Sequence, residues 1–316
     1  MSADMAHARR LRFAVELHGP LEGMTWLDTV RWVEDAGYST LFVPDHFDEG
    51  LGPIAAMAAA ATVSSELHIG PLVLAADFRH PVVLARELAT IDVLSGGRLE
   101  LGLGAGWKRQ DYTSSGMVMD PPKVRVDRMI EVATVLKGLF APGPFSFSGE
   151  HFTISELDGS PKPVQPGGPP LLIGAGAPRM LRWAGANADI VGVNPSIHSG
   201  EIDAAAARDA QVDRIDQKVA WVREGAGDRF EDLELNAWLA VANVTPDAAA
   251  TAELLAPAFE ADPEALLDSP MVMLGTIEEL VEQVLARRER WGYSYHVIPG
   301  DSALEFAPLV AELTGK

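Results

Sequence analysis

The sequence predicts an α/β protein, a (β/α)8 TIM barrel, from three observations. Short apolar runs rich in branched residues alternate with longer segments of helical period. This alternation is typical of βα units around a parallel sheet. There are eight such runs, and one barrel takes insertions beyond its usual length of about 250 residues. We therefore expect residues 1–316 to form a single domain.

The predicted strands are the apolar, branched runs. They are residues 12–17, 40–44, 68–75, 98–103, 170–174, 189–193, 235–244 and 294–298.

The predicted helices carry apolar residues at intervals of three and four positions. The first such stripe follows Trp26, and Gly37 is placed to end that helix. Thr276 and Glu279 form the pattern of a capping box before another stripe. The dipeptide Thr245-Pro246 predicts a cap followed by proline at the first helical position.

Residues 141–169 interrupt the alternation with turn residues and a short predicted hairpin. A loop of this length in a compact barrel is usually a lid, a binding loop or an interface element. We expect an inserted excursion after the helix that follows the fourth strand, near the active-site rim, rather than a ninth repeat.

Composition excludes several classes of protein. Hydrophobic residues make up 47% and charged residues 22%, as in an ordinary globular protein. No apolar stretch reaches the roughly 18 residues of a membrane span and no signal-type segment opens the chain, so we expect a cytoplasmic protein. A net charge of −20 opposes binding to nucleic acid or anionic membranes. The expected partner is therefore a small-molecule substrate.

Covalent and metal chemistry are also limited by the sequence. The chain has no cysteine, which excludes disulfides, thiolate metal sites and a cysteine nucleophile. No histidine or carboxylate spacing marks a metal site, and no G-x-S-x-G elbow marks a serine hydrolase. We expect no metal.

Barrel enzymes carry their chemistry at the carboxyl ends of the strands. Unusual residues gather at these positions here. They are Glu16 and His18 after the first strand, Asp45 and His46 after the second, Gly104, Gly106 and Trp107 after the fourth, Gly174, Ala175, Gly176 and Ala177 after the fifth, and Asn194 after the sixth.

The pair Asp45-His46 is the strongest catalytic candidate. It offers a carboxylate and an imidazole that exchanges a proton near neutral pH. Adjacent strand residues ordinarily point to opposite faces, so we treat the two as separate contacts to one ligand region. The alternative is a structural pair that caps the strand.

The turn before Pro178 is the best candidate for anion binding. Gly174 and Gly176 permit close approach to the backbone, and Ala177 has no side-chain oxygen to cap the helix. A bound phosphate would satisfy the free N–H groups. The alternative is a glycine-rich turn with water on the helix end. Local positive potential would come from Arg79, Lys108, Arg109, Arg179 and Arg182.

These segments resemble the luciferase-like monooxygenase superfamily, in particular its F420-dependent oxidoreductases. The motifs that carry the resemblance are FAVEL, AGYSTLFVPDHF, LSGGRLELGLGAGW and PPLLIGAGAPRM. The resemblance implies a luciferase-like barrel that holds a tricyclic cofactor across its mouth, with the phosphate-bearing tail near the turn after strand five. It also implies a non-proline cis peptide at Leu72-Val73.

The resemblance further implies roles for individual residues. Asp45 and His46 match the Asp-His of F420-dependent sugar-phosphate dehydrogenases, whose histidine contacts the reactive centre of the deazaflavin. Those enzymes have a glutamate where this chain has Trp107, which implies a different substrate or the reverse direction of hydride transfer. Leu72, Val73 and the glycine-rich turns would also bind cofactor, and Glu16, His18, Trp107 and Asn194 would contact substrate.

Three functions follow from these expectations. The first is an F420-dependent oxidoreductase acting on an unidentified small organic substrate, with His46 as proton donor. The second is an FMN-dependent monooxygenase, since FMN-dependent members share similar motifs. The third is a noncatalytic flavin-binding barrel, against which the polar groups at the strand ends count. We expect a homodimer.

Overall fold

The structure is a computed structural model, which describes residues 9–316. The chain divides into two compact units. Unit 1 contains the chain up to Glu16, Asp35–Ser39 and Ile173–Lys316, and unit 2 contains Leu17–Glu34 and Thr40–Leu172. Among residues 9–316, no helix combines the length and the apolar character needed to cross a membrane.

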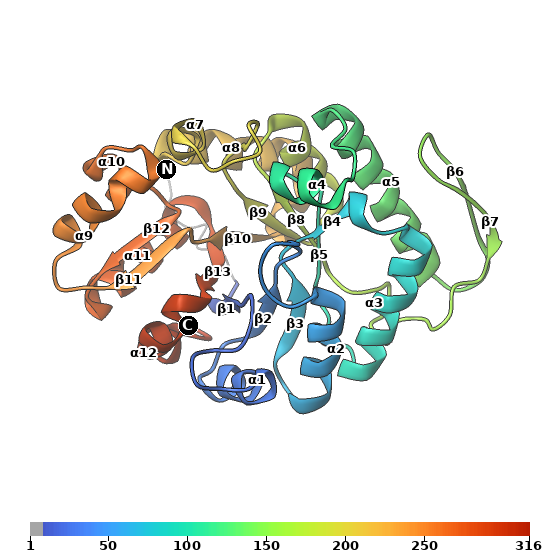
Figure 1. Cartoon of the computed structure of the whole chain (residues 1–316), viewed down its shortest axis with the longest axis horizontal. Coiled ribbons are helices and arrows are strands. Elements are labelled where there is room, and N and C mark those ends of the chain that lie inside the picture. The colour runs from blue at the N-terminus through green and yellow to red at the C-terminus, as the bar shows by residue number, and fades with distance from the viewer. Residues whose placement is uncertain (1–8) are drawn as a thin grey trace. The chain divides into compact units, whose positions relative to one another are not determined.

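Unit 2 contains two pairs of parallel strands and the helices that follow them (Figure 1). β2 pairs with β3, and β4 pairs with β5. Helix α3 packs against both α2 and α5. The elements are α1 (Trp26–Asp35), β2 (Thr40–Val43), α2 (Pro53–Val63), β3 (His68–Pro71), β4 (Leu74–Ala75), α3 (Pro81–Ser95), β5 (Leu101–Gly104), α4 (Arg109–Ser115) and α5 (Pro122–Phe140).

The fourth predicted strand begins later than expected, at Leu101, after an isolated parallel bridge between Leu99 and Ile69. The Arg98 guanidinium donates to the carbonyl oxygens of Ala61, Ser64 and Leu67 at 2.5–3.0 Å. Arg98 therefore joins the end of α2 to the segment before β3. The motif LSGGR thus has a structural role in this chain.

The third predicted strand is interrupted at Leu72-Val73, where the peptide bond is cis. This confirms the position that the resemblance implied. Strand β5 approaches this segment closely, because a Cβ on Gly104 would lie 2.6 Å from the Val73 Cγ2 atom. Glycine at position 104 therefore makes room for the Val73 side chain.

The excursion at residues 141–169 contains an antiparallel hairpin of β6 (Phe145–Ser148) and β7 (Thr153–Leu157), seen beyond α5 in Figure 1. Two carboxylates hold it to the helices. Glu131 of α5 accepts hydrogen bonds from three successive N–H groups, those of residues 150–152, at 2.6–3.1 Å. Asp92 of α3 accepts from the N–H groups of residues 164 and 165. The excursion is therefore fixed along the helices of unit 2.

Unit 1 contains a parallel sheet in the order β1-β13-β10-β9-β8. Its strands are β1 (Arg12–Glu16), β8 (Leu171–Ala175), β9 (Ile190–Val193), β10 (Glu234–Trp238) and β13 (Tyr293–Pro299). Its main helices are α6 (Pro178–Asn187), α7 (Ala204–Asp209), α8 (Val212–Ala226), α11 (Ile277–Trp291) and α12 (Ala303–Leu313). The capping box of Thr276 and Glu279 is confirmed at the start of α11.

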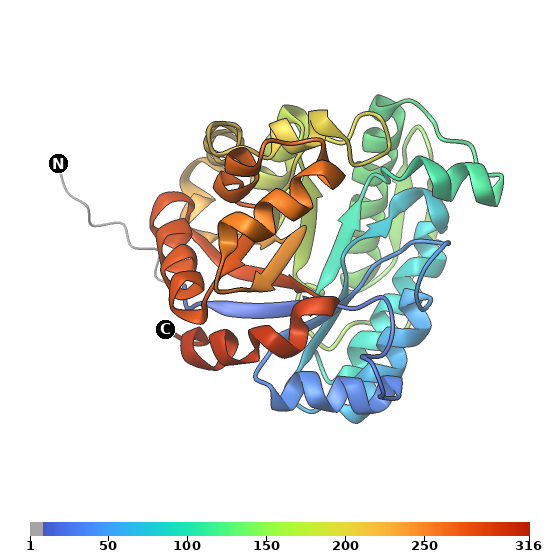
Figure 2. The same ribbon diagram turned by 60° about the vertical axis from the view of Figure 1, so that its left-hand side comes forward.

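The prediction of one strand over residues 235–244 was wrong. After β10 the Ala240 N–H bonds to the Met271 carbonyl, and β11 (Val241–Val244) pairs with β12 (Val272–Gly275) in a separate sheet. Figure 2 shows this small sheet in orange with α9 (Ala248–Leu255) and α10 (Pro263–Asp268). Buried alanine and leucine side chains join the helices to β12. The chain leaves the sheet that contains β10 because β11 pairs with β12 and packs against this second core.

The predicted cap at Thr245-Pro246 was also misplaced. The N-cap of α9 is Asp247, whose carboxylate accepts from the Ala250 N–H at 2.9 Å. The Thr245 hydroxyl, two residues earlier, instead accepts from the Asp247 N–H. Asp247 is the N-cap because it directly precedes the helix and its carboxylate reaches a free N–H group of the first turn.

Candidate functional site

His46 lies just beyond β2 and is paired with a residue that the sequence analysis missed. Its Nδ1 atom is 2.7 Å from Oδ2 of Asp111, which lies in the first turn of α4 and is 3% exposed. The other carboxylate oxygen accepts from the Phe47 N–H at 3.1 Å. Because an ionised carboxylate only accepts hydrogen bonds, Nδ1 carries the proton and Nε2 is left for a second partner.

Trp107 lies beside the same imidazole. The two rings are nearly perpendicular, with centroids 5.7 Å apart. Trp107 thus contacts His46, while the Tyr112 ring packs against Phe78. The indole, the imidazole and the buried carboxylate form one connected group at the ends of β2 and β5.

Asp45 has partners of its own. Its carboxylate accepts two hydrogen bonds from the Arg79 guanidinium, at 2.6 and 2.8 Å, and one from the Ala75 N–H at 3.1 Å. The side chain is 4% exposed. Asp45 and His46 therefore do not form a dyad, because each has a different partner. Arg79, a candidate for anion binding, is committed to Asp45.

The side chains of Tyr112 and Arg125 pack against the turn after β5. Gly106 has φ of 73°, and a Cβ there would lie 2.0 Å from the Tyr112 hydroxyl. That hydroxyl donates to Asp77 at 2.9 Å, while Arg125 donates to the Gly106 carbonyl. Burial, with the nearby Asp77 carboxylate, raises the pKa of the Tyr112 hydroxyl. Gly106 is therefore required by packing as well as by its backbone conformation.

Lys108 and His18 lie close to the carboxylates of the loop that follows His46. The Lys108 ammonium bonds to Asp48 at 2.7 Å and to Glu49 at 3.3 Å, and His18 Nδ1 lies 3.8 Å from Glu49. Burial acts to lower the pKa of Lys108, but the hydrogen bonds to both carboxylates outweigh it and raise the pKa. Lys108 holds the loop in place and is not free for an anion.

In unit 1, Glu16 meets a second residue that the sequence analysis missed. The Trp238 Nε1–H donates to the Glu16 carboxylate at 2.5 Å. The two residues end β1 and β10, the strands that flank β13. This contact joins two strand ends across the sheet of unit 1.

The turn from Gly174 to Ala177 leads into α6 as predicted. Ala177 is the N-cap of α6 and supplies no side-chain hydrogen bond. A Cβ on Gly176 would lie 2.6 Å from the Pro195 backbone, so glycine lets the turn pack against the segment after β9. The N–H groups at the start of α6 are donors of the kind that bind phosphate. Arg182, a second candidate for anion binding, instead pairs with Glu224 at 2.8 Å.

The segment after β9 is tied down by a buried ion pair. Asp209 accepts from the Ser196 N–H at 2.8 Å and from the Lys218 ammonium. Lys218 is 1% exposed, and burial lowers its pKa although Asp209 partly offsets this. The Asn194 N–H donates to the Ala175 carbonyl at 2.8 Å, so Asn194 lies beside the turn that precedes α6.

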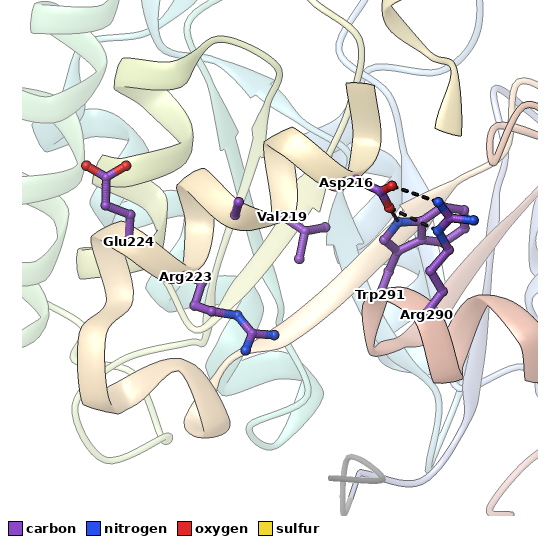
Figure 3. A pocket seen from close by; sticks show the side chains of 7 residues that line it. Asp216, Val219, Arg223, Glu224, Arg290 and Trp291 are labelled. Atoms are coloured by element: carbon purple, nitrogen blue, oxygen red, sulfur yellow. Dashed lines mark hydrogen bonds and ion pairs between the residues drawn. The ribbon is translucent and has the colours of Figure 1, made fainter. Parts of the chain in front are cut away.

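A hollow of about 480 Å³ lies between α8 and α11, away from these residues (Figure 3). Asp216 accepts from Arg290 and from the Trp291 Nε1–H at 2.7–3.0 Å, and Arg223 lies 4.3 Å from the Phe230 ring. None of the predicted site residues lines it. Each of its charged side chains already has a partner, since Glu224 pairs with Arg182, and we assign the hollow no ligand.

Comparison with known proteins identifies the family of the chain and an F420-dependent relative. The family model of luciferase-like monooxygenases matches residues 19–295. An F420-dependent glucose-6-phosphate dehydrogenase of Amycolatopsis mediterranei is 31% identical over 164 residues, which are 49% of this chain and 49% of that enzyme. The chain spans between a third and two thirds of the length of its curated relatives.

Solved structures extend the likeness over nearly the whole chain. The coenzyme F420-dependent tetrahydromethanopterin reductase of Methanopyrus kandleri has a TM-score of 0.75 at 19% identity and covers 97% of this chain and 99% of its own. The oxygenating constituent of 3,6-diketocamphane monooxygenase of Pseudomonas putida, in complex with FMN, has a TM-score of 0.67 at 16% identity and 96% coverage of both. These likenesses show the fold and confirm the predicted α/β barrel.

Proposed function

The chain belongs to the luciferase-like monooxygenase family, and on this premise we propose that it is an F420-dependent oxidoreductase. The family contains F420-dependent oxidoreductases and FMN-dependent monooxygenases. The proposed reaction transfers a hydride between the deazaflavin and a small organic substrate. The observation that carries the proposal is the His46–Asp111 pair at the end of β2, which leaves one imidazole nitrogen for a reacting group.

The residues present fit a cofactor that has a phosphate-bearing tail. Helix α6 begins without a side-chain cap, and glycine at position 176 keeps the preceding turn narrow. A phosphate at this helix end would accept hydrogen bonds from the backbone and would interact favourably with the helix dipole. We assign cofactor contacts within each unit separately: in unit 1 Gly174–Ala177 would hold the tail, and in unit 2 His46, Val73 and the Gly104–Gly106 turn would contact the ring.

When bound, F420 supplies a carbon in its central ring that gives or accepts a hydride. His46 moves the matching proton at Nε2, donating it when a substrate is reduced and accepting it when a substrate is oxidised. Asp111 holds the proton on Nδ1 and orients the imidazole ring. Asp45 acts at a distance, because its bonds to Arg79 and Ala75 fix the segment that follows Val73.

We assign substrate contacts within each unit separately. In unit 2 they fall to His18 and Trp107, and in unit 1 to Glu16 and Asn194. Trp107 touches His46, and the Glu16 carboxylate is held by Trp238. Aromatic and amide groups at these positions favour an organic substrate with both apolar and polar parts.

An FMN-dependent monooxygenase is the second candidate, supported by the FMN complex among the similar structures. The two are separated by incubating the protein with reduced F420 and with reduced FMN, and measuring the cofactor retained after gel filtration. We expect tighter retention of F420, by at least tenfold in dissociation constant. Retention of FMN alone, with oxygen-dependent turnover, would establish the monooxygenase instead.

A control variant separates cofactor binding from catalysis in the same experiment. His46→Ala should retain F420, since the proposed phosphate contacts lie at α6. Cofactor binding by the unchanged protein without turnover of any substrate or electron donor would support a noncatalytic flavin-binding barrel.

A further inference from the structure

Two amides in unit 1 have buried hydrogen-bonding atoms without a partner in the described part of the chain. They are Oδ1 of Asn194 and Nδ2 of Asn236. Asn236 is 1% exposed and lies in the middle of β10, and Asn194 follows the last residue of β9. Buried polar atoms of this kind are normally paired, because leaving one unpaired costs its full desolvation.

The two amides lie on one face of the sheet. Asn236 is in register with Gly192, and Asn194 is two positions beyond Gly192 in the extended chain. A Cβ on Gly192 would lie 3.5 Å from Asn236 Oδ1, 3.7 Å from Asn194 Nδ2 and 3.5 Å from the Cα atom of Gly174. Gly174 and Gly192 therefore lie side by side without side chains, and the two amides lie next to Gly192.

Two cations of unit 1, Arg12 and Lys218, are already paired with carboxylates. Arg12, near the start of β1, donates to Glu234 at 2.9 Å and lies 3.5 Å from the Tyr295 ring. Lys218 is committed to Asp209. A phosphate or carboxylate at the amides would therefore find no available cation among these groups, whereas a neutral group would find a donor and an acceptor.

We propose that Asn194 and Asn236 bind a neutral group of the substrate that carries a hydrogen-bond acceptor and a donor together, namely a carboxamide or lactam. Asn236 Nδ2 donates to its carbonyl oxygen, and Asn194 Oδ1 accepts from its N–H. This assignment rests on the proposed oxidoreductase function, and it names the substrate class. No bond is formed or broken at the amides, which hold the substrate.

The test uses three small probes with the full-length protein, free of cofactor. Side-chain NH₂ signals of asparagine are followed by ¹H–¹⁵N NMR during titration with δ-valerolactam, cyclohexanone or inorganic phosphate. We expect δ-valerolactam to shift the Asn236 signals, and cyclohexanone, which lacks a donor, to bind at least tenfold more weakly. Asn187, whose Nδ2 already donates to the Trp183 carbonyl at 2.9 Å, provides the control signal and should not move.

Two variants test whether the amides are structural. Asn236→Leu and Asn194→Leu keep a similar volume and remove the unpaired atoms, so the urea midpoint of the free protein should stay the same or rise. Both variants should lose the response to δ-valerolactam. A fall in the urea midpoint of both, with no response to the lactam in the parent protein, would make the amides part of the fold and overturn the proposal.

The outcome is distinct from that of the cofactor experiment. Phosphate shifting the Asn236 signals would overturn the neutral substrate class, and loss of F420 retention in Asn236→Leu would assign the amides to the cofactor. If F420 is not retained but the lactam shifts the signals, only the redox function fails. If F420 is retained and the lactam has no effect, only this inference fails.

Discussion

His46 and Asp111 are 65 positions apart in the chain, yet their side chains meet at 2.7 Å. The contact determines which nitrogen of the imidazole carries the proton in the neutral state. With Nδ1 bonded to a carboxylate, Nε2 has a lone pair and is the nitrogen that can accept a hydrogen bond from a ligand. The chemistry of His46 therefore depends on Asp111, and Asp45 contributes only indirectly.

Asp111→Asn should reverse this tautomer. The amide keeps the shape and still accepts from the Phe47 N–H, but it offers an N–H to His46 Nδ1 and so moves the proton to Nε2. We expect ¹⁵N NMR of the neutral imidazole to show Nδ1–H in the parent and Nε2–H in the variant. Turnover should fall by about 100- to 10,000-fold, the usual range for acid–base assistance.

Asp45→Asn is the matched control for this experiment. It weakens the bonds to Arg79 and leaves His46 with Asp111. The His46 tautomer should therefore be unchanged in Asp45→Asn. An unchanged tautomer in Asp111→Asn, or unchanged single-turnover oxidation of bound reduced F420 in His46→Ala, would show that His46 is structural.

Helix α6 has an alanine as its N-cap, which supplies no side-chain hydrogen bond to the first turn. Elsewhere in unit 1 the helices α7 and α9 are capped by Asp203 and Asp247. Four N–H groups at the start of any helix need partners outside it. The helices α8 and α12 also begin without a side-chain hydrogen bond at the N-cap, so α6 is one of three uncapped helices among α6–α12. We propose that a ligand phosphate takes the place of the capping side chain at α6.

Ala177→Asp should separate folding from cofactor binding. An aspartate N-cap typically stabilises a protein by about 0.5–2 kcal/mol relative to alanine. The same carboxylate would occupy the donors and repel a phosphate, so F420 affinity should fall at least tenfold while the urea midpoint rises. Affinity is measured by fluorescence titration of F420.

Ala177→Ser is the control, since serine caps the helix without a charge. It should weaken F420 binding less than Ala177→Asp does. Gly176 is unsuited to this test, because a Cβ there would meet the Pro195 backbone at 2.6 Å and disturb the fold itself. Equal F420 affinity in Ala177→Asp and the parent would move the phosphate site elsewhere.

The two units are interleaved in sequence, since unit 1 contains the segment before Leu17, Asp35–Ser39 and the C-terminal half of the chain. Neither unit is a continuous stretch of sequence. We therefore propose that residues 1–316 fold as one domain and unfold in one transition. Coincident urea curves from tryptophan fluorescence and far-ultraviolet circular dichroism would support this.

The stability of the molecule should depend on pH through His296. This histidine is buried in β13, with its ring 5.7 Å from that of Phe13, and burial lowers its pKa to about 3. Below the ordinary value of 6.5 the unfolded chain binds a proton that the folded chain does not. Stability is therefore fully present above pH 6.5 and falls as the pH drops towards 3.

One proton corresponds to a slope of about 1.4 kcal/mol per pH unit. His296→Gln removes this group. Between about pH 6 and about pH 4, the unfolding free energy of the variant should therefore depend on pH less steeply than that of the parent, by the slope of about one proton. Urea unfolding at several pH values measures both slopes. Equal slopes would mean that His296 is protonated in the folded state.

The sequence by itself determined the features that depend on neighbouring residues. Hydrophobic period placed the strands and helices, the Thr276–Glu279 box marked the start of α11, and Ala177 marked an uncapped helix. Strand-end positions pointed to His46, Glu16 and Asn194 before any geometry was known. These signals are readable because helix and strand periodicity and capping act over only a few residues.

Only the tertiary structure decided which side chains meet. Asp111 with His46, Trp238 with Glu16, and Asn236 beside Gly192 involve residues far apart in sequence, and no local pattern marks them. The same holds for the break between β10 and β11, where an apolar run continues while its hydrogen-bonding partner changes to Met271. Partner choice depends on packing across the whole fold, which local periodicity does not encode.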